Sequence, residues 1–252
     1  MHYLSGLLSQ PYAEFVPYML SRKWDITDKE NYWYRRGTTD YALVAHVDTL
    51  CEEPHRMKLR INKKGFISNK TGILGADDRA GVWLISQLLD LNPHVFLFNY
   101  EEFGGVGVNR FLKEHEFPSG IKFLIEFDRR GYDEYVYYSS THPVKLCKWA
   151  EVFGFSEGWG SYSDVSDITN ATRIPHLNMS AAFTGEHSAM ERLHWPTLQR
   201  LSEKYHKMLL SAPKNVEKLP KPRKREISDT FWKNSKYLWD DRFDYAEHTI
   251  IA

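Results

Sequence analysis

The sequence predicts an α/β protein: a doubly wound, mixed but mostly parallel sheet with helices on both faces. Three short apolar runs predict buried strands, at Tyr41–Val47, His94–Tyr100 and Ile121–Phe127. Two helical segments lie between them, at Asp78–Leu91 and Gly105–Glu114. Near-continuous apolar strands suit a sheet that is covered on both faces, and strands alternating with helices build such a sheet.

Further elements extend this pattern in both directions along the chain. Mixed helical periodicity at Tyr12–Lys23 predicts a first helix. Additional strands are predicted at Glu134–Ser139 and Ile174–Asn178, and Pro196–Leu210 predicts a final helix that closes the core.

The composition changes after that final helix. Ser211–Arg225 carries three prolines and a basic cluster, which we interpret as a solvated linker. The aromatic segment Phe231–Tyr245 is expected to pack back on the domain rather than to bind a partner. We therefore expect a catalytic domain over residues 1–211, followed by a linker and aromatic tail over residues 212–252.

The bulk composition is that of an ordinary soluble globular protein. The 252 residues, 42% hydrophobic and 26% charged, are enough for one domain with a sizeable core. The 33 basic and 33 acidic residues cancel, which gives no support for a nucleic-acid partner. We expect no membrane partner, because no apolar run is long enough to span a bilayer. No secretion signal is recognisable and only Cys51 and Cys147 are present, which favours a reducing, cytoplasmic location. The oligomeric state is left open.

Acidic and histidine side chains gather at the ends of the predicted strands, where ligands bind in open α/β sheets. The first strand ends in His46-Val47-Asp48; because side chains alternate along an extended backbone, those of His46 and Asp48 point the same way. Asp77 and Asp78 stand in a Gly-flanked turn before an apolar helix. A helix N-cap would account for one of these two aspartates.

Three further segments add side chains of the same kind. Glu101 and Glu102 follow the strand HVFLFNY, Asp128 follows IKFLIEF, and His187 lies in the polar loop TGEHS. Adjacent carboxylates at the edge of a core are costly unless a cation compensates them. The candidate metal ligands are therefore two imidazoles and three carboxylates, namely His46, Asp77, Glu102, Asp128 and His187.

This set of side chains suits two zinc ions. Zinc accepts nitrogen and carboxylate ligands, and a bridging carboxylate lets five residues hold two ions with positions left for water. Two neighbouring ions can activate a water molecule and polarise a carbonyl. Glu101 is left over and can take the proton of that water and pass it to a leaving amine. The sequence therefore predicts a metal-dependent hydrolase, with a peptide or another small amide as substrate.

The same segments resemble the zinc exopeptidase superfamily, which includes the M20, M28 and M42 metallopeptidases. The resemblance runs from about Asn31 to Leu210 and is carried by LVAHVDTL, ILGADDRAGV, FLFNYEEFGGVG, LIEFDRRG and SDVSDITNATRIPHLNMSAAFTGEHSAMERL. It implies a metallopeptidase of the exopeptidase type with two zinc ions, either an aminopeptidase or a di- or tripeptidase. Co²⁺ or Mn²⁺ could replace zinc.

The resemblance also implies a role for each site residue. His46 and Asp128 would bind one zinc, Glu102 and His187 would bind the other, and Asp77 would bridge them. Asp48 would orient His46, and Glu101 would be the general acid/base. Asp164 would lie near the site, although Asp167 competes for that alignment.

Many M20 members insert a lid or dimerisation domain between the residues that correspond to Asp128 and His187. Here the gap is 59 residues (187 − 128), and part of it must supply core elements, so a separate domain of roughly 100 residues does not fit. We expect no inserted lid. Two alternatives to a peptidase stay open: a deacylase of N-acyl amino acids, and a zinc-binding scaffold without catalysis.

Some polar residues near these segments are not expected to serve as ligands. Arg129 and Arg130 could meet a substrate carboxylate, but a solvated position is the commoner fate of such residues. His142 and His194 are expected to lie outside the metal site.

Overall fold

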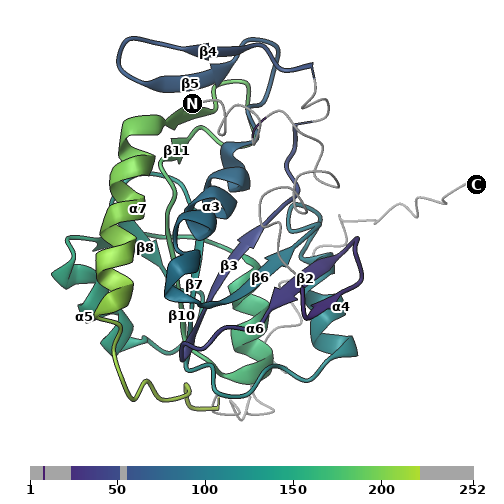
Figure 1. The fold of residues 1–252 in the computed structure, drawn as a ribbon, viewed down its shortest axis with the longest axis vertical. Coiled ribbons are helices and arrows are strands. Elements are labelled where there is room, and N and C mark those ends of the chain that lie inside the picture. Colours follow the sequence, from purple (N-terminus) through teal and green to yellow (C-terminus); the bar gives the residue numbers. More distant parts are fainter. Residues whose placement is uncertain (1–7, 9–23, 52–55, 222–252) are drawn as a thin grey trace, which may run out of the picture. The chain divides into compact units, whose positions relative to one another are not determined.

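A computed structural model describes Leu8, residues 24–51 and residues 56–221 (Figure 1). Within these residues the main sheet has eight strands in the order β1-β2-β6-β3-β7-β10-β8-β9. Its centre is parallel: β3 (Tyr41–His46) lies between β6 (His94–Phe98) and β7 (Phe123–Arg129), and β7 also pairs with β10 (His176–Ser180). The carboxyl ends of these strands therefore meet at one edge of the sheet.

Shorter strands complete the two sides of this sheet. On one side β2 (Tyr32–Arg35) pairs antiparallel with β6, and β1 (Ile26–Thr27) pairs antiparallel with β2. On the other side β8 (Glu134–Val136) pairs antiparallel with β10, and β9 (Ser156–Glu157) runs parallel to β8. The sheet is therefore mixed at its edges.

Helices cover both faces of the sheet (Figure 1). One core contains residues of α3 (Ala76–Gln87), α5 (Val144–Val152) and α7 (Trp195–Leu210). The other contains residues of α4 (Val106–Glu114) and α6 (Asp164–Thr172). Alternate residues of β3 enter the two cores, Leu43 and Ala45 the first, Ala42 and Val44 the second. This explains why the strand reads as one continuous apolar run.

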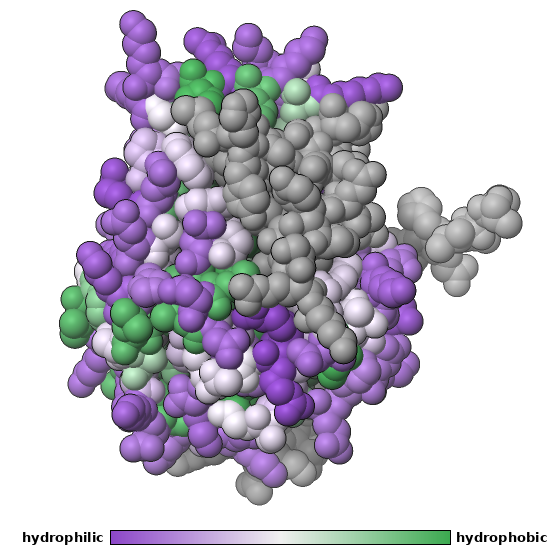
Figure 2. Space-filling model, in the orientation of Figure 1, coloured by the Kyte–Doolittle hydropathy of each residue, from purple (hydrophilic) through white to green (hydrophobic). Residues whose placement is uncertain are grey.

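A second, four-stranded antiparallel sheet has the order β11-β12-β5-β4. It consists of β4 (Leu59–Ile61), β5 (Phe66–Asn69), β11 (Phe183–Thr184) and β12 (Arg192–His194). Long hydrophilic side chains project at the β4–β5 end of the molecule (Figure 2). Because β12 follows the loop that contains His187, its pairing with β5 fixes one end of that loop.

The predicted fold class is confirmed. The three apolar runs form β3, β6 and β7, and the predicted helices form α3, α4 and α7. The first of these helices ends at Gln87, after which Leu89–Leu91 form a short 3₁₀ helix, η2. The residues between Asp128 and His187 form β8, α5, β9, α6, β10 and β11 of the same domain, so the predicted absence of an inserted lid is confirmed. Helices α5 and α6 and the second sheet were not predicted.

The interpretation of Ser211–Arg225 as a linker stays a prediction, but part of it, residues 213–220, contacts the domain. Val216 and Leu219 are buried, and the Leu219 amide donates a hydrogen bond of 2.8 Å to the carbonyl of Arg173. The Arg173 guanidinium donates in turn to the carbonyl of Pro220. This stretch therefore packs on the domain, because its two apolar side chains find a place in the core.

Other expectations lie partly or wholly outside the described residues. The helix expected at Tyr12–Lys23 and the aromatic segment Phe231–Tyr245 fall there. The division of the chain into residues 1–211 and 212–252 stays a prediction. Among the described residues, every helix is too short or too polar to cross a bilayer.

Candidate metal centre

His46 is the centre of a first group of possible metal ligands. It is the last residue of β3 and is buried, and its Nε2 lies 3.1 Å from Oδ1 of Asp77 and 3.4 Å from Oδ1 of Asp128. Asp128 comes from the adjacent strand β7, and Asp77 from the start of α3. Three elements that are distant in sequence therefore place these side chains together.

The other oxygen of Asp77 faces a second group. Its Oδ2 lies 3.2 Å from Nε2 of His187, and the same nitrogen lies 2.9 Å from Oε2 of Glu102. His187 has a left-handed backbone with φ of 58°, and its side chain is 52% exposed, whereas that of Glu102 is 6% exposed. All five sequence-predicted ligands are thus brought together, and Asp77 stands between the two histidines.

Asp48 supports both groups from one side. Its Oδ1 lies 3.3 Å from Nδ1 of His46, the ring nitrogen that faces away from Asp77. Its two oxygens also accept hydrogen bonds from the amides of Glu101 and Glu102, at 3.1 and 3.2 Å. The Asp48 carboxylate therefore orients the imidazole and holds the turn that carries both glutamates.

The electrostatics of the centre call for cations. Burial raises the pKa of Glu101 to about 8 and that of Glu102 to about 7, and the neighbouring carboxylates add to both shifts. Burial would lower the pKa of His46, but Asp128, Asp48 and Asp77 together raise it well above its ordinary value. Without metal, protons must supply the positive charge that these carboxylates need. Divalent ions meet the same need, so the residues present fit a metal centre.

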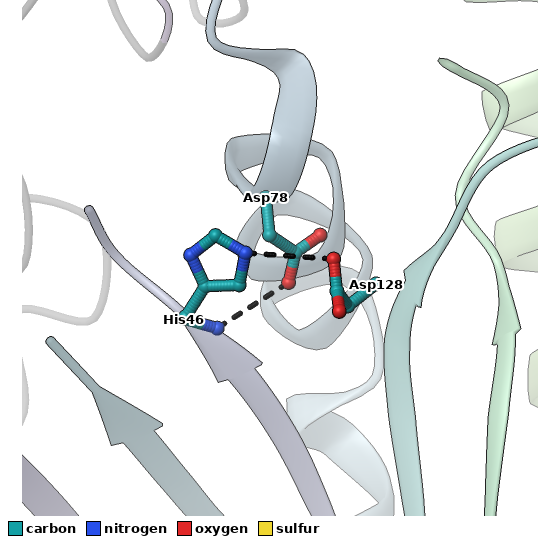
Figure 3. A group of neighbouring side chains, drawn as sticks. All are labelled: His46, Asp78 and Asp128. Atoms are coloured by element: carbon teal, nitrogen blue, oxygen red, sulfur yellow. Dashed lines mark hydrogen bonds and ion pairs between the residues drawn. The ribbon is translucent and has the colours of Figure 1, made fainter. Parts of the chain in front are cut away.

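Asp78 also approaches the first group, which the sequence did not indicate. His46, Asp78 and Asp128 each offer one ligand atom within a common range of 4.8 Å (Figure 3). Oδ2 of Asp78 accepts a hydrogen bond from the His46 amide at 3.3 Å, and its Oδ1 accepts one from Gly81 at 3.0 Å. The carboxylate is thus engaged with backbone, and it fixes the end of β3 against the start of α3. The peptide bond between Asp77 and Asp78 is cis.

Further buried polar groups lie behind Asp128. Asn178 of β10 accepts from the Asp128 amide at 2.9 Å, and the Ser163 hydroxyl lies 2.8 Å from Oδ2 of Asp128. The same hydroxyl lies 2.5 Å from Oε2 of Glu126, so its single hydrogen serves one of two carboxylates. Burial raises the pKa of Glu126 well above its ordinary range. None of these residues had a recognisable sequence signal, since each depends on pairing between distant strands and helices.

The structure shows which of Asp164 and Asp167, the two aspartates that competed in the alignment, lies near the centre. Asp164 is fully buried at the start of α6, and neither of its carboxylate oxygens has a hydrogen-bond partner among the residues that the structure describes. Its pKa is raised by burial and by the nearby carboxylates of Glu126 and Glu101. Asp167 instead accepts hydrogen bonds from Tyr162 and Asn109. Asp164 is therefore the one that neighbours the centre.

A cavity of about 250 Å³ opens beside the two groups. Asp77, Glu101, Asp128, His187 and Glu186 supply most of its charged lining, together with Arg129 and Arg130. Each arginine is paired, Arg129 with Glu134 at 2.6 Å and Arg130 with Glu186 at 2.7 Å. Aromatic walls are supplied by Tyr138, Trp159, Tyr162 and Phe183. His142 and His194 belong to neither group: the first lies 3.7 Å from Glu157, and the second packs on Phe66.

Comparisons with solved structures identify the fold. Aminopeptidase PepT from Bacillus cereus superposes with a TM-score of 0.60 at 13% identity, over 80% of this chain and 92% of that one. The TET1 peptidase of Pyrococcus horikoshii gives a TM-score of 0.58 at 15% identity, over 86% and 99%. An aminopeptidase from Desulfurococcus kamchatkensis gives 0.58 at 12% identity, over 88% and 98%. The chain has the fold of the zinc exopeptidase superfamily.

Comparisons of sequence add nothing to this result. No protein-family model matches the chain, and no curated protein matches it.

Proposed function

We propose that the protein is a peptidase with two zinc ions, and that it removes amino acids from the amino-terminus of peptides in the cytoplasm. The observation that carries the proposal is the position of Asp77, whose two oxygens lie 3.1 Å from His46 and 3.2 Å from His187. A carboxylate that faces two separate imidazoles is suited to bridge two ions. The likeness in fold to aminopeptidases supports the same conclusion.

The donor set supports zinc as the metal. His46 and Asp128 would hold one ion, Glu102 and His187 the other, and Asp77 would contribute to both. Two imidazoles and three carboxylates suit zinc, and Co²⁺ or Mn²⁺ also accept such ligands. When bound, the ions would polarise the scissile carbonyl and make the attacking water more acidic.

Glu101 is the proposed general acid/base. It lines the cavity beside Asp77 and Asp128 and is left outside both groups of ligands. Its carboxylate would take a proton from the attacking water and return it to the leaving amine as the amide bond breaks. The hydrogen bond from its amide to Asp48 holds the backbone of the turn in place, and its side chain lines the cavity.

The charges that line the cavity favour a free amino-terminus over an N-acyl amino acid. Of the four carboxylates that line it, those of Asp77 and Asp128 are proposed zinc ligands and that of Glu186 is paired with Arg130, which leaves Glu101 to face a substrate ammonium group. An N-acyl amino acid carries a free carboxylate instead and would need a cation of the protein. The two arginines that line the cavity are both already paired with glutamates.

A panel of matched substrates tests this proposal with the zinc-loaded full chain. The panel contains aminoacyl anilides, short peptides, the same peptides with an acetylated amino-terminus, and N-acyl amino acids. We expect hydrolysis of the anilides and free peptides, and little hydrolysis of the acetylated peptides. Cleavage of N-acyl amino acids alone would make the protein a deacylase, and no cleavage of any substrate would favour the non-catalytic scaffold.

A further inference from the structure

Glu191 lies outside both ligand groups and is attached to the turn that carries Asp77. Its Oε2 accepts hydrogen bonds from the amides of Leu74 and Gly75, at 2.9 and 2.7 Å. Its Oε1 accepts one from the amide of Asp77 itself, at 3.0 Å. Three amides of a single turn, those of residues 74, 75 and 77, thus occupy both oxygens of one carboxylate.

This carboxylate is buried without a cation. Glu191 is 1% exposed, and among the described residues it forms no ion pair. A buried carboxylate is costly unless its oxygens are satisfied, and here the three backbone N–H groups of the turn that leads into α3 satisfy them. The three donors therefore require two acceptor atoms on one side chain, and a carboxylate provides them.

The three hydrogen bonds fix a stretch of backbone that departs from helical geometry. Asp77 has φ of −77° and ψ of 107°, although it lies in the first turn of α3. Gly75 precedes it with φ of 70°. The orientation of the Asp77 carboxylate between the two histidines thus depends on a turn that Glu191 holds from outside.

Glu191 also ends the loop that carries His187. Within this loop the Glu191 amide donates to the carbonyl of Ser188 at 3.0 Å, and the Ser188 hydroxyl donates to the carbonyl of Gly185 at 2.8 Å. One residue therefore joins the His187 loop to the Asp77 turn. Both segments contribute to the second group of ligands.

The two groups differ in how firmly the rest of the fold holds them. His46 and Asp128 belong to the central strands β3 and β7, and their side chains are 1% and 10% exposed. His187 is 52% exposed and stands on a loop. We propose that Glu191 is a positioning residue that sets the affinity of the second metal site, formed by Asp77, Glu102 and His187, by locking the His187 loop to the Asp77 turn. This inference rests on the two-ion centre proposed above.

Glu191→Gln tests the inference because it keeps the size and removes one acceptor. Whichever way the amide is oriented, its NH₂ group faces at least one N–H donor, so at least one hydrogen bond is lost. We expect the second zinc ion to bind roughly 10- to 100-fold more weakly, the usual effect of removing a group that supports a metal ligand. The first ion should bind with an affinity within a few-fold of the parent.

The measurement is a titration of the metal-free full chain with zinc in the presence of a chelating indicator, which resolves the two binding steps. Glu203→Gln, on an exposed position of α7, is the matched control and should leave both steps unchanged. Glu191→Asp keeps the charge but reaches fewer of the three donors, and we expect a smaller loss at the same step. This second variant keeps the test decisive if Glu191→Gln folds poorly by circular dichroism.

The possible results separate this inference from the proposed function. Equal weakening of both steps, or parental affinities in a folded variant, would overturn the positioning role of Glu191. A parent that binds fewer than two zinc ions would overturn both proposals. A parent that binds two ions but cleaves no amide would overturn the peptidase proposal, while selective weakening of the second step would still support the role of Glu191.

Discussion

His176 of β10 is a buried histidine whose protonation should destabilise the protein as the pH falls. Its Nε2 accepts a hydrogen bond from the Tyr138 amide at 2.9 Å, and its Nδ1 lies 2.6 Å from the Thr169 hydroxyl. That hydroxyl already donates to the carbonyl of Ile174 at 2.6 Å, so it accepts from Nδ1–H. Neither ring nitrogen is free to take a proton, and burial lowers the pKa of His176 from 6.5 to about 3.

The sign and size of the effect follow from this pKa difference. Below pH 6.5 the unfolded chain binds a proton at His176 that the folded protein does not bind. The stability that depends on the neutral ring is therefore present above pH 6.5 and is lost progressively as the pH falls from there towards 3. At pH 5 the loss is about 2 kcal/mol, from the separation of about 1.5 units between that pH and the unfolded pKa.

Urea unfolding of the metal-free protein at pH 7 and pH 5 measures this loss. His176→Gln removes the titrating ring and keeps an acceptor for the Tyr138 amide. The variant will be less stable than the parent at pH 7, but its free energy of unfolding should fall by about 2 kcal/mol less than that of the parent between the two pH values. If parent and variant lose the same stability over this interval, the assignment of a neutral buried His176 is wrong.

Three further perturbations test the centre and its support. Asp77→Ala should lose most of both zinc ions, whereas Glu102→Gln should weaken the binding of only one ion. Elemental analysis after dialysis measures both effects. Parental metal content in the Asp77 variant would exclude a bridging role. Gly81→Ala should destabilise the protein by about 1–3 kcal/mol in urea, because its Cβ would lie 2.3 Å from the carbonyl of Phe127 and 2.5 Å from the Asp78 carboxylate; unchanged stability would show that this contact relaxes freely. A chain shortened to end at Lys221 should keep its metals and its turnover. A chain that ends at Ala212 should lose about 3–5 kcal/mol of its free energy of unfolding, because it lacks the buried Val216 and Leu219. Equal stability of the two shortened chains would show that residues 213–221 add nothing to the core.

Four of the five candidate ligands could be predicted because they stand at or near the end of a recognisable strand or helix, whereas His187 was indicated by its polar loop. His46 and Asp128 follow apolar runs that are buried on both faces, and such runs are the strongest local signal in the sequence. Parallel strands bring their carboxyl ends to one edge, so the proximity of the two followed from the fold class alone. The same argument placed Glu102 beside them.

The supporting residues could not be predicted, because their partners are set by tertiary packing. Glu191 reads as one more acidic residue in a polar loop, and only the approach of that loop to the turn before α3 reveals its role. The sequence accounts for one of Asp77 and Asp78 as a helix N-cap, but it does not show that the Asp78 carboxylate joins β3 to α3. The strands of the second sheet are two to four residues long, too short for a period to be read.

The contact of residues 213–220 with the domain could not be predicted for a similar reason. Three prolines and several lysines dominate the composition of Ser211–Arg225 and predict a solvated segment. Two isolated apolar residues, Val216 and Leu219, are nevertheless enough to attach it to the domain, with the Leu219 amide and the Pro220 carbonyl both bound to Arg173. Isolated apolar residues carry no periodic signal, so composition alone could not show this contact.

The measurement that tests the central claim most directly is the turnover and zinc content of Glu101→Gln. The glutamine keeps the shape of the side chain and can still hydrogen-bond a water molecule, but it cannot accept a proton. We predict that hydrolysis of an aminoacyl anilide falls by roughly 100- to 10,000-fold, the usual contribution of a positioned acid/base, while the variant retains two zinc ions per chain and the thermal stability of the parent. Glu102→Gln, the same change at the adjacent residue, should lose zinc together with activity. Hydrolysis by Glu101→Gln at the parental rate would contradict the account, because the residue would then have no part in the chemistry.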